Sequence, residues 1–170
     1  VKAIDGRPAR PLVSCDNLLD LVDEATLDPN RDFFLRLTSF SLALGGRDSV
    51  DAESGRKMRE RLRRALPWLP DEIFDLRTKQ TFKDNVARAV CSALPPFDLV
   101  VIDEAHNLKH GWSTDGAARN RVLSLVLGRA GEADEKLFPN FGPRAKRVLF
   151  LSATPIDETY RHLWNQLDLV

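Results

Sequence analysis

Two stretches of the chain are apolar, rich in β-branched residues, and followed at once by short polar clusters. The first reads Asp-Leu-Val-Val-Ile-Asp-Glu-Ala-His over 98–106, and the second reads Arg-Val-Leu-Phe-Leu-Ser-Ala-Thr over 147–154. Apolar runs of this length are typical of the buried strands of a parallel sheet. Ligands of open α/β sheets bind outside the carboxyl ends of the strands. We therefore expect the two polar clusters to lie close together in space.

Apolar residues at helical spacing occur between and around these runs. They predict five helices, at 18–25, 54–66, 81–94, 115–127 and from 157 onward. Asn17 and Asp157 are expected to cap the first and last of these helices, and Gly128 is placed to end the fourth. A further strand is expected over 33–39. Residues 1–16 are expected to form a surface segment or a cut end, and residues 129–146 a long loop. This alternation predicts an α/β fold, a parallel sheet with helices on both faces.

The helix predicted at 81–94 has the clearest internal pattern. Thr81-Phe-Lys-Asp84 reads as a capping box that opens it. Its apolar face is expected to consist of Phe82, Val86, Ala89, Val90 and Ala93.

Composition narrows the class of protein without choosing a function. Apolar residues make up 43% of the 170, which suffices for a core, and 25 basic residues balance 25 acidic ones. The net charge of the chain therefore does not indicate attraction to nucleic acid. Two cysteines form no disulfide framework and fit a reducing interior, and no apolar run approaches a membrane span. We expect a cytoplasmic, bacterial protein without membrane association, with the nucleus as the alternative compartment. Arginine outnumbers lysine 18 to 7, which hints at a GC-rich genome.

The polar clusters contain residue types suited to nucleotide chemistry. An acid at a strand tip can hold Mg²⁺, usually through water, while the metal bridges nucleotide phosphates. A second acid beside it can orient or deprotonate the attacking water. Asp103 suits the metal role and Glu104 the water role. The hydroxyls of Ser152 and Thr154 could then bond to His106 or to the acidic pair.

The two clusters also resemble a known family. Asp103-Glu-Ala-His106 resembles motif II, the Walker B box, of superfamily 2 helicases and translocases, and Ser152-Ala-Thr154 resembles their motif III. Motif II is followed by Asn-Leu-Lys at 107–109. Motif III is followed by Pro-Ile at 155–156 and then by a stretch containing Leu163 and Trp164. These are similar to the Swi/Snf-type branch, which moves along duplex DNA. The resemblance extends over 97–170.

The resemblance implies a fold, cofactors and partners. Residues 1–170 would form part of a RecA-like P-loop NTPase lobe, with a helical insertion at 40–80, and would use ATP and Mg²⁺. A second RecA-like lobe of the same chain and double-stranded DNA would be its partners. His106, Ser152 and Thr154 would couple hydrolysis to DNA contact. The cations placed near the DNA path are Lys109, Arg119 and Arg121, for which exposure to solvent alone is the alternative.

One expected part of this family's machinery is missing from the sequence. The phosphate-binding loop needs Gly-Lys-Ser/Thr, and none of the nine glycines is followed by lysine. The arginine fingers of the family belong to the second lobe. The chain also begins at Val1, with Met58 its only methionine. We therefore expect an internal excerpt that hydrolyses little ATP by itself. Two alternatives stay open: a catalytically silent regulatory module, and a nucleotide-driven enzyme that does not act on nucleic acid.

Three smaller patterns carry weaker expectations. His106 and His110 lie four residues apart, but the zinc pattern His-Glu-x-x-His is absent, so no metal role is assigned to His110. The arginine-rich run 56–64 could grip phosphates, although a solvated helix face is the favoured interpretation. Trp68 and Trp164 are expected in the core.

Overall fold

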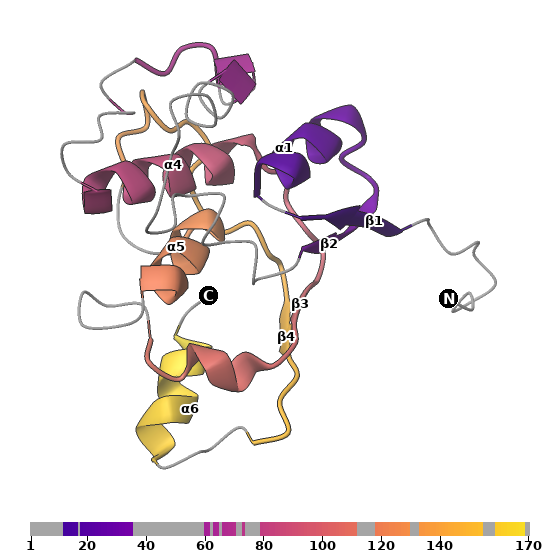
Figure 1. The fold of residues 1–170 in the computed structure, drawn as a ribbon, viewed down its shortest axis with the longest axis vertical. Coiled ribbons are helices and arrows are strands. Elements are labelled where there is room, and N and C mark those ends of the chain that lie inside the picture. Colours follow the sequence, from indigo (N-terminus) through magenta and orange to yellow (C-terminus); the bar gives the residue numbers. More distant parts are fainter. Residues whose placement is uncertain are drawn as a thin grey trace. The chain divides into compact units, whose positions relative to one another are not determined.

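The computed structural model describes residues 12–16, 18–35, 60–61, 63–64, 66–70, 73, 79–111, 118–129, 133–154 and 159–168. They belong to two compact units, one within 1–65 and the other within 66–170. Each unit combines helices with a pair of parallel strands, which confirms the α/β class (Figure 1). Among these residues, no helix has the length and apolar character needed to cross a membrane.

The first unit is a strand–helix–strand arrangement. Strand β1 (Leu12–Cys15) pairs in parallel with β2 (Asp32–Leu35), and helix α1 (Leu18–Leu27) connects them. The apolar face of α1, including Leu18 and Val22, is buried. The helix predicted at 18–25 is thus confirmed, while its expected cap Asn17 lies outside the described residues. β2 confirms the start of the strand expected at 33–39.

Strand β1 lies within the segment 1–16, for which the sequence predicted no strand. Its sequence, Leu-Val-Ser-Cys, has only four residues, too few to show a period of two. Pairing with β2 along the register from Leu12↔Asp32 to Cys15↔Leu35 supplies the hydrogen bonds that make it a strand. A tertiary contact therefore decides the conformation of this segment.

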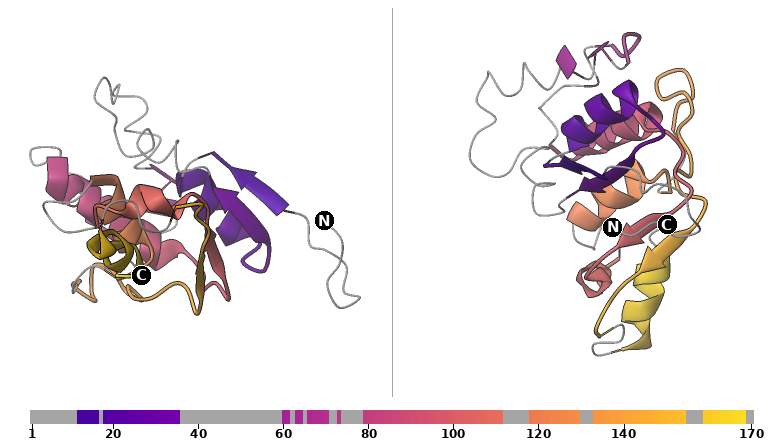
Figure 2. Two further views of the ribbon diagram at one scale, coloured as in Figure 1. Left: turned by 90° about the horizontal axis from the view of Figure 1, so that it is seen from below. Right: turned by 90° about the vertical axis from the view of Figure 1, so that its right-hand side faces the viewer.

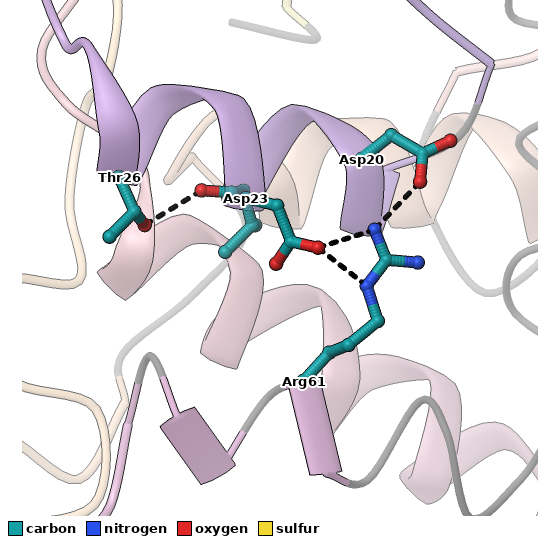
Figure 3. A network of polar contacts seen from close by, with 5 residues as sticks. Asp20, Asp23, Thr26 and Arg61 are labelled. Atoms are coloured by element: carbon teal, nitrogen blue, oxygen red, sulfur yellow. Dashed lines mark hydrogen bonds and ion pairs between the residues drawn. The ribbon is translucent and has the colours of Figure 1, made fainter.

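An ion-pair network ties the arginine-rich segment to α1 (Figure 3). Arg61 Nη2 lies 2.6 Å from Asp20 Oδ1 and 2.7 Å from Asp23 Oδ2. Burial opposes the charge of this guanidinium, but the hydrogen bonds to both carboxylates outweigh burial and raise the pKa of Arg61. One arginine of the run 56–64 thus has a structural role. Most of the helix expected at 54–66 falls outside the description.

The second unit has a helical core made by α4 (Lys79–Ala93) and α5 (Ala118–Val126), which pack against each other. The predicted apolar face of α4 is largely confirmed, because Phe82, Val86, Ala89 and Val90 are buried. The capping box is wrong. The helix begins at Lys79, before Thr81, and the Asp84 carboxylate binds Arg121 of α5, with Nη2 and Oδ2 2.9 Å apart.

The two strands predicted around the polar clusters are present and adjacent. Strand β3 (Val100–Ile102) pairs in parallel with β4 (Val148–Phe150), with Val100 opposite Val148 and Ile102 opposite Phe150 (Figures 1 and 2). An isolated bridge between Phe97 and Ala145 precedes the strands. Parallel pairing places the carboxyl ends of both strands at one edge.

The described residues cover one face of this strand pair. Within the unit, α4, α5 and α6 (Tyr160–Leu167) lie on the same side of β3 and β4 (Figures 1 and 2). The other face is apolar and exposed, and is formed by Leu99, Val101, Leu149 and Leu151. Helices on both faces, as expected from the sequence, are thus not observed in this part of the chain.

The tryptophan expectations are also corrected. Trp164 is 68% exposed and Trp68 is 49% exposed, so neither is a core residue in the described structure. Tyr160, Trp164 and Leu167 form an exposed apolar stripe along α6. The indole Nε1 of Trp68 donates to the backbone carbonyl of Leu137 at 3.4 Å. Helical spacing predicted a helix here but not which of its apolar residues are buried.

A close backbone contact fixes the end of α5. Gly128 has φ +84°, which confirms the predicted helix stop, and it lies directly against the backbone of Gly142. Next to this contact, the Arg144 amide donates to the Leu127 carbonyl at 3.0 Å and the Cys91 thiol donates to the Gly142 carbonyl at 3.5 Å. Within 133–147 there is no helix or strand, as expected for a loop.

Candidate functional site

The strand pair brings the two polar clusters to one edge. Asp103 and Glu104 follow β3 directly, and Ser152 comes two residues after the end of β4. The pairing continues past the strands, because the Leu151 amide donates to Ile102 and the Ala105 amide donates to Leu151, both at 2.9 Å. The expected proximity of the two strand ends is therefore observed at the level of the backbone.

Glu104 has an unusual backbone conformation. Its φ of 53° and ψ of 44° lie in the left-handed region, which residues other than glycine rarely adopt. Asp103 Oδ1 accepts a hydrogen bond from the Glu104 amide at 2.9 Å. Asn107 holds the other side, donating from its backbone amide and from Nδ2 to the Glu104 carbonyl, each at 3.0 Å. Neighbouring groups thus support a conformation that costs about 1–3 kcal/mol.

The side chain of Glu104 points into an accessible environment and lies near His106. It is 63% exposed, and its Oε2 atom lies 3.1 Å from His106 Nδ1. That nitrogen is buried and makes no hydrogen bond within the described residues, so the two side chains are in contact without a hydrogen bond. A solvent-accessible carboxylate beside an imidazole can accept a proton from a bound water.

The hydroxyl cluster is arranged differently from the expectation. Ser152 Oγ accepts a hydrogen bond from the Thr154 amide at 3.3 Å, which is a local cap of the turn after β4. No hydrogen bond between these hydroxyls and Asp103, Glu104 or His106 occurs in the described structure. The next residues, 155–158, with Pro155 and the expected cap Asp157, lie outside it. Ser152 thus has a local capping role in this structure, and its coupling role stays a prediction.

The three cations proposed for nucleic-acid contact differ in their surroundings. The Arg121 guanidinium makes three hydrogen bonds to Asp84, between 2.9 and 3.2 Å. These bonds are the main cause that raises the pKa of Arg121. Lys109 is half-buried in the turn after the acidic pair, and the side chain of Arg119 is not among those described. Arg121 thus connects α4 to α5, and its contact with nucleic acid stays a prediction.

Asn107 is a site residue to which sequence reasoning gave no role. It follows Glu104 by three residues within the short 3-10 helix η3 (Ala105–Leu108), so both of its donors can reach one carbonyl. An asparagine three residues after a strand-tip acid is a weak sequence signal, because it becomes meaningful only once the left-handed residue before it is known.

The acids fit a water-rich magnesium ion better than a protein-enclosed metal. In the described ranges, no group of three or more His, Cys, Asp or Glu side chains could hold a metal ion. Mg²⁺ bound between protein and phosphates needs only one or two carboxylates, with water completing its shell. Asp103 is exposed and offers Oδ2 for this purpose, because Oδ1 is used by the Glu104 amide. No protein-family model, curated protein or solved structure matches the chain.

Proposed function

We propose that this chain belongs to the first RecA-like lobe of an ATP-dependent DNA translocase or helicase, of superfamily 2 and closest to its Swi/Snf-type branch. Its substrates are ATP with Mg²⁺ and double-stranded DNA, and a second lobe of the same protein supplies the opposing face of the nucleotide site. The motif II sequence Asp-Glu-Ala-His and the motif III sequence Ser-Ala-Thr are the basis of this assignment.

One structural observation supports the proposal more than any other. The segments before the two motifs are neighbouring parallel strands in direct register, Val100 opposite Val148. The two motifs, which are far apart in the sequence, therefore lie at the same edge of one strand pair. This edge is where α/β proteins bind ligands. A chance match to either motif would not explain why the two motifs are adjacent. A nucleotide site formed by both polar clusters requires this adjacency.

Asp103 and Glu104 have different roles in ATP hydrolysis. Asp103 anchors the magnesium shell through Oδ2, and Mg²⁺ when bound neutralises charge on the phosphates. Glu104 orients the attacking water and accepts its proton, and its accessible carboxylate suits that task. The left-handed backbone of Glu104 directs this side chain away from the direction that a continued strand would give it. His106 lies beside Glu104, with Nδ1 3.1 Å from Oε2, and together with Ser152 and Thr154 it couples hydrolysis to DNA contact.

Substitution of Glu104 tests the proposal. In the full gene product, Glu104→Gln keeps the shape of the side chain but removes the base, so kcat for DNA-stimulated ATP hydrolysis should fall about 10²- to 10⁴-fold. Binding of ATP should persist. The matched control is Glu135→Gln, the same change at an exposed glutamate in the 133–147 loop, and it should leave turnover intact.

The outcomes separate the proposal from its two alternatives. Turnover near the wild-type rate in Glu104→Gln would remove this residue from catalysis. A wild-type protein that binds ATP without hydrolysing it would favour the silent regulatory module. Hydrolysis that duplex DNA does not stimulate would favour a nucleotide-driven enzyme acting on another substrate.

A further inference from the structure

The turn that follows the acidic pair is held by the last described helix. The Asn165 side chain, on α6, donates from Nδ2 to the Lys109 carbonyl at 2.8 Å. η3 and α6 lie beside each other (Figures 1 and 2). This hydrogen bond joins a helix that follows β4 to the turn that follows β3.

The two residues after Lys109 also contact α6. Gly111 has φ +68°, and a Cβ placed on it would lie 3.3 Å from Asn165 Cγ, so glycine permits the close approach. The His110 ring meets the ring of His162 edge to face, with centroids 6.3 Å apart. Three consecutive residues of the turn therefore rest on one face of the helix, with Asn165 providing its directional contact.

A series of backbone hydrogen bonds connects this contact to Glu104. The Lys109 amide donates to the His106 carbonyl at 3.2 Å, and the Asn107 amide donates to the Glu104 carbonyl at 3.0 Å. Asn165 thus fixes the end of a short turn whose beginning is the left-handed Glu104. A conformation of that kind persists only where surrounding contacts impose it.

We propose that Asn165 is a positioning residue for Glu104: its amide holds the Lys109–Gly111 turn on α6 and so keeps the catalytic carboxylate in place. This inference rests on the proposed function. Misplacement of a catalytic group by about 1 Å can cost up to about 10²-fold in rate.

Two substitutions of Asn165 remove the donor in different ways. Asn165→Ala deletes the amide and keeps a good helix former, whereas Asn165→Asp keeps the shape but loses the donor. Hydrogen exchange at the Asn107, Lys109 and Gly111 amides should accelerate about fivefold in both, as expected for loss of one neutral hydrogen bond. In the full gene product, kcat for ATP should fall about 3- to 10-fold with KM unchanged, because Glu104 and not nucleotide binding is disturbed. Arg161→Ala, at an exposed position on α6, is the control.

Each readout decides a separate part of the proposal. Accelerated exchange together with a fall in kcat at constant KM, in both variants, supports it. Exchange at Lys109 and Gly111 that matches wild type in both variants overturns the contact. Accelerated exchange with normal kcat overturns the positioning role. An effect seen only in Asn165→Asp also overturns it, because the added negative charge would then be the cause. If the wild-type protein does not hydrolyse ATP, the proposed function fails, while the exchange rates still show whether Asn165 holds the turn.

Discussion

Replacement of Gly128 by alanine is the most informative test of the fold. The residue has φ +84°, and a Cβ built on it would lie 1.7 Å from the Gly142 carbonyl oxygen and 2.1 Å from its carbon. Atoms cannot approach so closely, and the obstacle is backbone that no side-chain rotation can clear. The segment after α5 must therefore separate from the segment around Gly142.

The cost of this separation follows from the contacts that it breaks. A non-glycine residue in the left-handed region costs about 1–3 kcal/mol. Separation also disrupts the Arg144 amide to Leu127 carbonyl bond and the Cys91 thiol to Gly142 carbonyl contact, each contributing about 1 kcal/mol. We expect Gly128→Ala to lower the free energy of unfolding by about 3–5 kcal/mol, within the range of severe substitutions.

Urea unfolding of the two glycine variants provides the measurement. With a slope of about 2 kcal/mol per M, the expected loss moves the midpoint down by about 2 M. The control is Gly142→Ala, the partner in the same contact, where an added Cβ has nothing within 4 Å. Its midpoint should match wild type within a few tenths of a molar. Equal midpoints for wild type and Gly128→Ala would refute the close packing of these two segments.

Three further variants test other parts of the molecule. Asp103→Ala should weaken nucleotide binding only when Mg²⁺ is present, so an unchanged Mg²⁺ dependence of affinity would contradict its metal role. Ser152→Ala with Thr154→Ala should reduce DNA translocation, measured by triplex displacement, more than ATP hydrolysis; equal losses would leave only the cap. Asp84→Asn leaves Arg121 without its carboxylate and should cost about 2–3 kcal/mol in urea unfolding, whereas an unchanged midpoint would show that this pair contributes nothing.

The sequence predicted the structure best where the local residue pattern and the tertiary contacts require the same residues. The apolar runs before Asp103 and Ser152 predicted strands, and β3 and β4 confirm them. The burial that these runs also predicted is found on only one face of the pair in the described residues. The buried face of α4 and the stop at Gly128 were equally readable. Strand β1 was missed since its four residues carry no usable period. Asp84 was misassigned because a capping box and an ion pair with another helix use the same carboxylate.

The geometry of the candidate site was less predictable. Residue types named the acidic pair, but no local rule places Glu104 in the left-handed region, because glycine or asparagine is the usual occupant there. The contact between Asn165 and Lys109 joins segments 56 residues apart, so only the folded chain reveals it. The exposure of Trp164 likewise depends on which elements lie opposite α6, which the spacing of apolar residues does not encode.

At position 104, thermal stability and catalytic activity favour different residues, because the backbone of Glu104 is left-handed. Glycine at 104 would adopt φ 53° without strain and would relieve about 1 kcal/mol or more. A library screened for heat resistance alone should therefore enrich glycine here, although that residue has no carboxylate. Under the proposed function the same screen would discard the hydrolytic base. Engineering for robustness then has to fix residue 104 and seek its gains elsewhere, since sites that do chemistry commonly sit below their stability optimum.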